Sequence, residues 1–213
     1  AQVEDEALEL SQGAEPLVRE ALDLPPAISG TRRQMLLARL ILQFGRGLVR
    51  DGVDAPDTPD QAVRLATALA KLIDEVQTQD LGFSGLDGLV ADRYAHHWQE
   101  TLRFLQIVTR FWPDLLEEIG ATDPKVREFA LMRAQAQAWI VAPPQDPVIV
   151  AGSTGSVPAT AELMRVVAGL PDGAVILPGL DTESDDATWA AIKGDPSHPQ
   201  NGLARLLDQF DMT

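Results

Sequence analysis

The sequence predicts an α/β protein that is predominantly helical, in which a helical layer is followed by a βαβ unit with a small parallel sheet. Three observations support this fold class. Apolar residues recur at helical spacing over most of residues 31–141. A cluster of prolines at 143–147 then interrupts this pattern. Two short apolar runs beyond it, at 148–151 and 174–177, flank one more helical segment.

The composition suits a globular chain of 213 residues that is 45% hydrophobic and 23% charged. We divide it into an acidic N-terminal segment at 1–30, a helical region at 31–144 and an α/β region at 145–213. The chain has no cysteine, which excludes disulfides and thiolate metal sites and fits a reducing compartment. No apolar run approaches the roughly 20 residues of a membrane span, so we expect a cytoplasmic protein that makes no membrane contact.

The net charge of −15 bears on nucleic-acid binding. A protein that held DNA with its whole surface would be expected to be basic. Any DNA contact therefore requires a local basic patch, or the remainder of a larger assembly.

The helical region begins where Ser29 can cap a helix over residues 31–50. One face of this helix carries Leu36, Leu37, Leu40, Ile41, Phe44 and Leu48. Thr58 and Pro59 then predict the start of a second helix, because proline fits the first helical position. Its apolar stripe consists of Ala62, Leu65, Ala66, Leu69, Leu72, Ile73 and Val76.

Three glycines predict a loop over residues 80–88. A long helix is expected from about 88 to 119, with a possible interruption at Pro113. Asp123 and Pro124 open the last helix of the region, which ends before the prolines at 143 and 144.

The α/β region starts with an apolar run at 148–151, which predicts a short buried strand. A helix over 158–170 and a second strand over 174–177 follow, and this spacing predicts a parallel βαβ unit. Two strands need further strands or helices beside them. The remaining residues predict one helix over 185–192 and a last helix containing Leu203, Leu206, Leu207 and Phe210.

The turn between the first strand and its helix is the first candidate site. It consists of Gly152, Ser153, Thr154, Gly155 and Ser156, and is called the GSTGS turn below. Ligands bind at such turns in open α/β sheets, and the N-terminus of a helix attracts phosphate. Neither the Walker A nor the Rossmann pattern is present. The alternative is a tight turn in which Ser156 caps the helix.

Four arginines form the second candidate site, a contact to DNA or to a protein partner. Arg32, Arg39 and Arg46 are seven residues apart and share one helix face, opposite the apolar residues, and Arg50 follows on the same helix. A row of guanidinium groups can meet phosphates or the acidic face of a partner. The alternative is a solvated face paired with local carboxylates.

One acidic segment and one segment with two histidines contain residue types that bind metals, but neither has a complete ligand set. Asp181, Glu183 and Asp185 imitate the start of a calcium loop, but Asp186 replaces its glycine and Ile192 its final glutamate. These carboxylates can instead stabilise the following helix. His96 and His97 have acidic neighbours one turn away but no third ligand, and His198 has no visible partner. We therefore expect no metal site and no catalytic set in this chain.

The stretch PVIVAGSTGSVPATAELMRVVAGLPDGAVILPGLD (147–181), with DDATWAAI and DPSHPQNGLARLLD after it, resembles the alphaproteobacterial AddB-type subunit of the AddAB helicase–nuclease. HHWQETLRFLQIVTRFWPDLLEE (96–118) and PPAISGTRRQMLLARLIL (25–42) are similar to it too. Members of that family are much longer, with a half like superfamily 1 helicases and a nuclease domain. The resemblance implies an internal fragment of the helicase-like, RecA-like half.

The resemblance also implies a role in processing DNA double-strand ends for recombinational repair. The partner would be an AddA-type helicase–nuclease subunit, with DNA held in the full complex. ATP, Mg²⁺ and an iron–sulfur cluster belong to the full-length family. This chain would hold none of them, because it has no Walker A loop, no cysteine and no carboxylate directly after its first strand. We therefore expect a degenerate motor fold without ATPase, helicase or nuclease activity.

Two other functions stay open at this point. One is a small nucleotide- or phosphate-binding α/β protein that uses the GSTGS turn. The other is a helical interaction module without a ligand. Saturable nucleotide binding would favour the first of these, and association with a partner subunit favours a scaffold.

Overall fold

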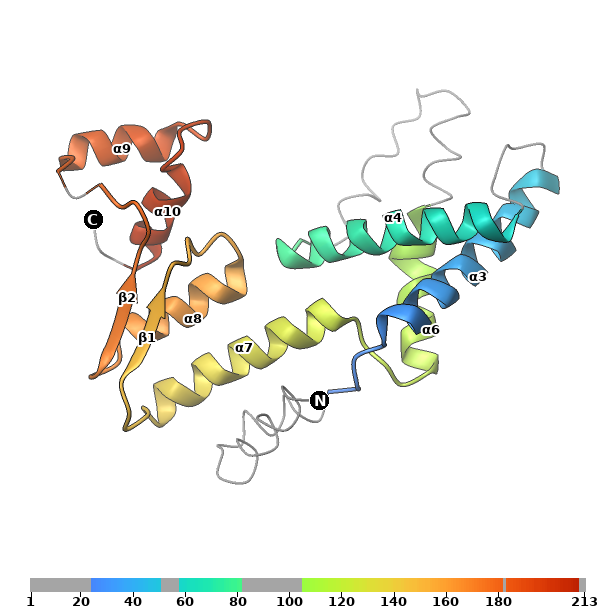
Figure 1. The fold of residues 1–213 in the computed structure, drawn as a ribbon, viewed down its shortest axis with the longest axis horizontal. Helices are drawn as coiled ribbons and strands as arrows, with labels where there is room; N and C mark the ends of the chain where they lie inside the picture. The colour runs from blue at the N-terminus through green and yellow to red at the C-terminus, as the bar shows by residue number, and fades with distance from the viewer. Residues whose placement is uncertain (1–23, 51–57, 82–104, 182, 211–213) are drawn as a thin grey trace. The chain divides into compact units, whose positions relative to one another are not determined.

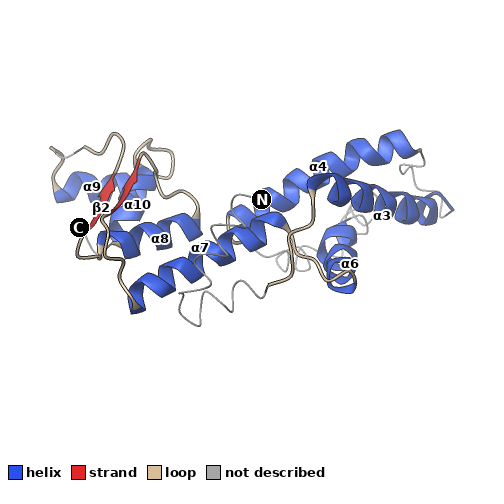
Figure 2. Ribbon diagram, turned by 60° about the horizontal axis from the view of Figure 1, so that its bottom comes forward, coloured by secondary structure: helices blue, strands red, loops and turns tan. Residues whose placement is uncertain are grey.

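The computed structural model describes residues 24–50, 58–81, 105–181 and 183–210 (Figure 1). Helices make up most of this part, and its β-structure consists of two short strands apart from one isolated bridge (Figure 2). The predicted helical α/β character is therefore confirmed. The elements are α3 (Gly30–Arg50), α4 (Pro59–Thr78), the π-helical turn η2 (Ile107–Phe111), α6 (Trp112–Glu118), α7 (Pro124–Val141), β1 (Val148–Ala151), α8 (Pro158–Ala168), β2 (Gly173–Ile176), α9 (Asp186–Gly194) and α10 (Asn201–Gln209).

The chain divides into two compact units, and the division lies inside α7. One unit, called the helical unit, spans Pro25–Arg127. The described residues 128–181 and 183–210 belong to the other, called the α/β unit. Most of the acidic N-terminal segment, residues 82–88 of the predicted loop and residues 88–104 of the predicted long helix lie outside the described residues.

The helical unit is built around the packing of α3 against α4. Leu37 and Ile41 of α3 are fully buried, and Ala62 and Ala66 give α4 small side chains that let the two helices approach closely. Ser29 Oγ accepts a bond from the backbone N–H of Arg32 (3.4 Å), in line with its predicted place at the start of α3. The predicted apolar faces therefore form the core of this unit.

The described end of the predicted long helix contains a π-helical turn that the sequence analysis did not anticipate. Pro113 has no N–H and cannot bond to the preceding turn, which favours a change of helical register nearby. Trp112 N–H donates to the carbonyl of Ile107, five residues back, and α6 starts at this tryptophan. Ile107 and Trp112 are both buried. The interruption predicted at Pro113 is thus a π turn within a continuous helical segment.

The α/β unit contains the predicted parallel βαβ arrangement, in which α8 connects β1 to β2. Ile149 lies opposite Ala174, and Val150 opposite Val175. The core on one side of the strands contains Met164 from α8 and Leu206 from α10, with Val150 and Val175 packed against it. This packing places α8 and α10 on the same face of the sheet.

The other face of the sheet is exposed in the described structure, so the prediction that the first strand is buried was wrong. Ile149 is 62% exposed and Ile176 is 58% exposed, and burial alternates along both strands. A short apolar run predicts a strand but does not reveal which of its faces is covered. Parallel sheets are ordinarily covered on both faces, so this apolar face is unusual.

Candidate functional site

The GSTGS turn joins β1 to α8, as predicted. Gly152 (φ +79°) and Gly155 (φ +61°) have left-handed backbone conformations, which glycine adopts without steric strain. The N–H of Gly152 donates to the carbonyl of Ile176 (3.1 Å), and the N–H of Gly155 donates to Ser153 Oγ (3.3 Å). A Cβ at Gly155 would come too close to the side chain of the buried Leu206, which would have to shift to admit it.

The chemistry of the GSTGS turn is limited to hydroxyl and backbone groups. Its sequence contains no charged side chain. The expectation that Ser156 caps the helix is wrong, because the N-cap of α8 is Val157, and no side chain caps it. Pro158 follows as the first helical residue and has no N–H to offer an anion. The turn therefore lacks the cation that a phosphate loop uses.

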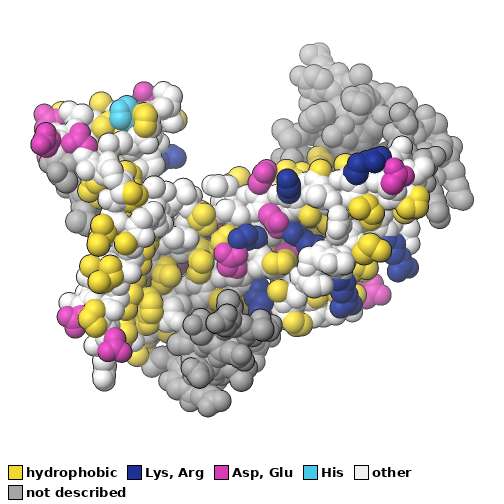
Figure 3. Space-filling view, viewed as in Figure 1, with side chains coloured by type: hydrophobic (Ala, Val, Ile, Leu, Met, Phe, Trp, Pro, Cys, Tyr) yellow, Lys and Arg dark blue, Asp and Glu magenta, His cyan; other side chains and the backbone are white. Residues whose placement is uncertain are grey.

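The arginine row lies on α3, where Arg32 and Arg39 are exposed. The backbones of Arg46 and Arg50 continue the helix, but their side chains lie outside the described residues. Lys and Arg side chains are distributed over the visible face of the helical unit in Figure 3. The structure therefore places the two described arginines on one solvent-facing helix surface.

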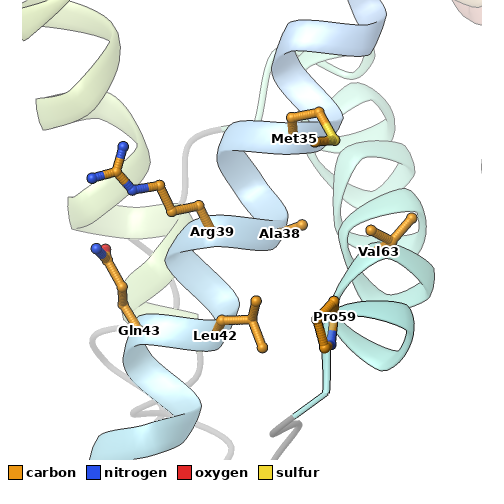
Figure 4. A pocket seen from close by; sticks show the side chains of 7 residues that line it. All are labelled: Met35, Ala38, Arg39, Leu42, Gln43, Pro59 and Val63. Carbon is orange, nitrogen blue, oxygen red and sulfur yellow. The ribbon is translucent and has the colours of Figure 1, made fainter.

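Arg39 borders a groove of about 380 Å³ between α3 and α4. Met35 and Leu42 of α3 lie opposite Val63 of α4, whereas Arg39 and Gln43 lie on the side of α3 turned away from α4 (Figure 4). Met35 is 63% exposed. The groove thus has an apolar lining next to the arginine row, a feature that the sequence analysis missed.

Arg33 is a buried arginine of α3 that the sequence analysis did not single out. It is 5% exposed, and its Nη1 donates to Asp74 Oδ1 over 2.7 Å. Its Nε lies 2.9 Å from Asp123 Oδ1 but is not aligned for a hydrogen bond, so this contact acts through charge. The spacing could have revealed Arg33, because it lies four residues before the buried Leu37.

Asp123 is the acidic centre of this buried cluster, with an exposed fraction of only 2%. Its Oδ2 accepts hydrogen bonds from Trp112 Nε1 and from Gln77 Nε2, each over 2.9 Å. Asp123 also precedes the first residue of α7. Because Asp123 links Trp112, Gln77 and the guanidinium of Arg33 away from solvent, we assign the cluster to stability rather than to ligand binding.

The acidic loop after β2 has a local structural role. Asp181 accepts bonds from Glu183 N–H and Ser184 Oγ, each over 2.8 Å. The bond from the Glu183 backbone is the main cause that lowers the pKa of Asp181. Asp185 caps α9 by accepting from Thr188 N–H over 2.8 Å, and hydrogen bonding to Thr188 lowers its pKa. This agrees with the interpretation of these carboxylates as supports for the next helix.

The described part of the chain contains no cluster of histidine and acidic side chains that could bind a metal. His198 is exposed, and its Nδ1 accepts from the backbone N–H of Gln200 over 3.2 Å. His96 and His97 lie outside the described residues. Among the residues that the structure covers, no group of three or more acidic or histidine side chains could hold a metal ion. No helix in that same part combines the length and apolarity of a membrane span.

Comparison with protein-family models, curated proteins and solved structures finds no match to this chain. The similarity of residues 147–181 to the AddB-type subunit therefore stays a prediction from the sequence. Evidence on function comes from the residues and their geometry.

Proposed function

We propose that this chain is a non-catalytic scaffold segment of an AddB-type DNA repair subunit, in which a degenerate helicase-like domain supports the processing of double-strand ends. The main support for the proposal is the identity of the residues at the end of β1. A motor ATPase places acidic residues after such a strand, where they hold Mg²⁺ and orient water. Here β1 ends at Ala151 and continues into Gly152 and Ser153.

The residues present do not fit a nucleotide–magnesium site. The GSTGS turn contains no lysine for phosphates, and its Ser153 hydroxyl accepts a bond from Gly155 N–H. The chain also has no cysteine for a thiolate-held iron–sulfur cluster. Nucleotide and cluster chemistry would then belong to other parts of a longer polypeptide or to its partner subunit.

The exposed face of α3 supplies the contact surface in this proposal. Arg32 and Arg39 can meet DNA phosphates or the acidic face of an AddA-type partner in the cytoplasm. The apolar groove beside Arg39 adds area for a protein contact. The acidic charge of the whole chain is compatible with this role, because other domains would hold most of the DNA.

The alternative function is a small nucleotide- or phosphate-binding protein that uses the GSTGS turn. One observation favours it, since a Cβ at Gly152 would meet nothing within 4 Å, so a ligand could approach the backbone there. The uncharged turn and the proline at the start of α8 weigh against it.

A nucleotide assay separates the two functions. We expect purified chain to show neither hydrolysis of Mg-ATP nor saturable binding of a fluorescent ATP analogue. Saturable binding that Gly152→Leu abolishes and Gly179→Leu preserves would establish the alternative. Gly179 is a matched control, because it also has a positive φ (+67°) and open space at its Cβ position. Robust ATP turnover would overturn the scaffold proposal.

A second experiment tests the arginine row. The double variant Arg39→Glu/Arg46→Glu should reduce recovery of an AddA-type partner or of end-containing DNA in a pull-down. The variant Arg165→Glu/Arg205→Glu makes the same charge change at exposed residues of α8 and α10 and should have little effect. Unchanged recovery of both partner and DNA by the first variant would remove the row from the proposal.

A further inference from the structure

The outer edge of β2 has unused backbone hydrogen-bonding groups. Val148 N–H donates to the carbonyl of Asp172, and Gly152 N–H donates to the carbonyl of Ile176. The backbone N–H and C=O groups of the even-numbered residues along β2 therefore point toward β1. Backbone groups alternate in direction along a strand. Val175 and Leu177 therefore direct theirs to the opposite edge, where no further strand pairs within the described residues.

An apolar groove of about 270 Å³ runs along this same edge. Its lining includes Gly173, Val175, Leu177, Leu180, Leu207 and Phe210. The groove thus combines free main-chain donors and acceptors with apolar side chains from the strand, the following loop and α10. This combination is what an added β-strand needs, because the backbone provides affinity and alternate side chains fill the apolar surface.

Carboxylates neighbour several groove-lining residues in the sequence. The exposed Asp172 precedes Gly173, and Asp181 follows Leu180, whereas Asp208, which follows Leu207, is paired with Lys193. In Figure 3, hydrophobic side chains extend along the strands of the α/β unit, and acidic side chains are visible over α9 and at the lower end of the unit. A second copy of this chain would bring the same carboxylates and a net charge of −15 to the contact, which disfavours self-pairing.

We infer that the outer edge of β2 takes up an extended segment of a second protein, with alternating apolar residues and with Lys or Arg at both ends. Its main chain pairs with Val175 and Leu177, and its apolar side chains enter the groove. Its basic ends lie near Asp172 and Asp181. The inference does not depend on the DNA-repair role.

Binding of synthetic peptides to the intact chain tests this inference. The probe is a fluorescent peptide that alternates Val and Thr between Lys-Lys ends, followed by anisotropy. We expect saturable binding of the unmodified peptide. N-methylation of every second backbone amide of the peptide should abolish binding in one of the two possible registers and preserve it in the other. Because only one set faces β2, equal effects of the two modifications would overturn strand pairing. This test leaves the protein unchanged, so misfolding cannot explain the result.

The charge component has its own test and control. Asp172→Lys should weaken binding of the Lys-flanked peptide about two- to five-fold at low salt, with a smaller effect at high salt. Glu118→Lys makes the same charge change at an exposed residue of the helical unit and should leave binding unchanged. Equal binding of Lys-flanked and Glu-flanked peptides would overturn the proposed partner chemistry. A dimer of the chain that excludes the peptide would show that a second copy occupies the edge.

Discussion

Trp112 Nε1 donates a hydrogen bond of 2.9 Å to Asp123 Oδ2 and so ties α6 to the residue that precedes α7. Both side chains are 2% exposed. The second oxygen of the same carboxylate faces the guanidinium of Arg33 on α3. One buried carboxylate thus connects three segments of the helical unit, and its contacts give the first two predictions.

Removing the charge of Asp123 should strongly destabilise the helical unit. Asp123→Asn keeps the shape of the side chain but leaves Arg33 with only the half-exposed Asp74 as its described counter-charge, which should cost about 2–3 kcal/mol of unfolding free energy. Urea unfolding measures the change. Arg64→Met, which breaks the solvent-exposed pair with Asp60, should change the free energy of unfolding far less. Equal effects of the two variants would contradict the assigned role of Asp123.

Removing the indole N–H should have a separate and smaller effect. Trp112→Phe leaves Asp123 Oδ2 with Gln77 as its remaining described hydrogen-bond donor and opens space in the core, which should cost about 2 kcal/mol. Unfolding followed by circular dichroism avoids the loss of tryptophan signal. Trp189→Phe on α9, where the indole is half-buried, is the matched control and should cost less. A larger effect at Trp189 would count against the hydrogen bond.

Gly173 should not tolerate a side chain at the start of β2. A Cβ there would collide with the backbone carbonyl oxygen of Val167, so Gly173→Ala should destabilise the α/β unit by about 1–3 kcal/mol. Gly202→Ala should act in the opposite direction. Gly202 lies in α10 with nothing within 4 Å of its Cβ position, and alanine is favoured in helices by about 0.5–1 kcal/mol. Thermal melting of the two variants should therefore shift in opposite senses.

The cap of α9 should make stability depend on pH in the acidic range. Hydrogen bonding to Thr188 lowers the pKa of Asp185 in the folded chain below the ordinary value of 3.8. The Asp185 carboxylate therefore binds a proton more readily in the unfolded state than in the folded state. The stabilisation that the charged cap provides is present above pH 4 and is lost as the pH falls through the pKa of Asp185 in the folded chain. Asp185→Ala should lower the melting temperature at pH 7, and the difference from the unmodified chain should shrink below pH 4.

A neighbouring acidic residue provides the control for the cap. Glu183→Ala removes an exposed carboxylate from the same loop, with no assigned cap function, and should change the melting temperature less at pH 7. A pH-independent difference for Asp185→Ala would mean that the charged carboxylate is not the stabilising group.

Much of the local structure was predictable because its causes are local. Pro59 and Pro158 mark helix starts, since each supplies a fixed φ where no N–H is needed. The spacing of Leu37 and Ile41 predicted the buried face of α3. The positions of two apolar runs around one helix predicted the parallel strand pair. The GSTGS turn was placed correctly for the same reason, although the cap assigned to Ser156 was wrong.

The sequence by itself determined the helical α/β character, the order of the elements and the uncharged chemistry of the turn after β1, because these follow from local periodicity and composition. Only the tertiary structure decided that Arg33 rather than Arg39 is buried against Asp123, and that one face of the strands is exposed at Ile149 and Ile176. Both outcomes depend on which distant segments meet. Burial and ion pairing are set by those contacts, and local spacing along a chain does not encode them.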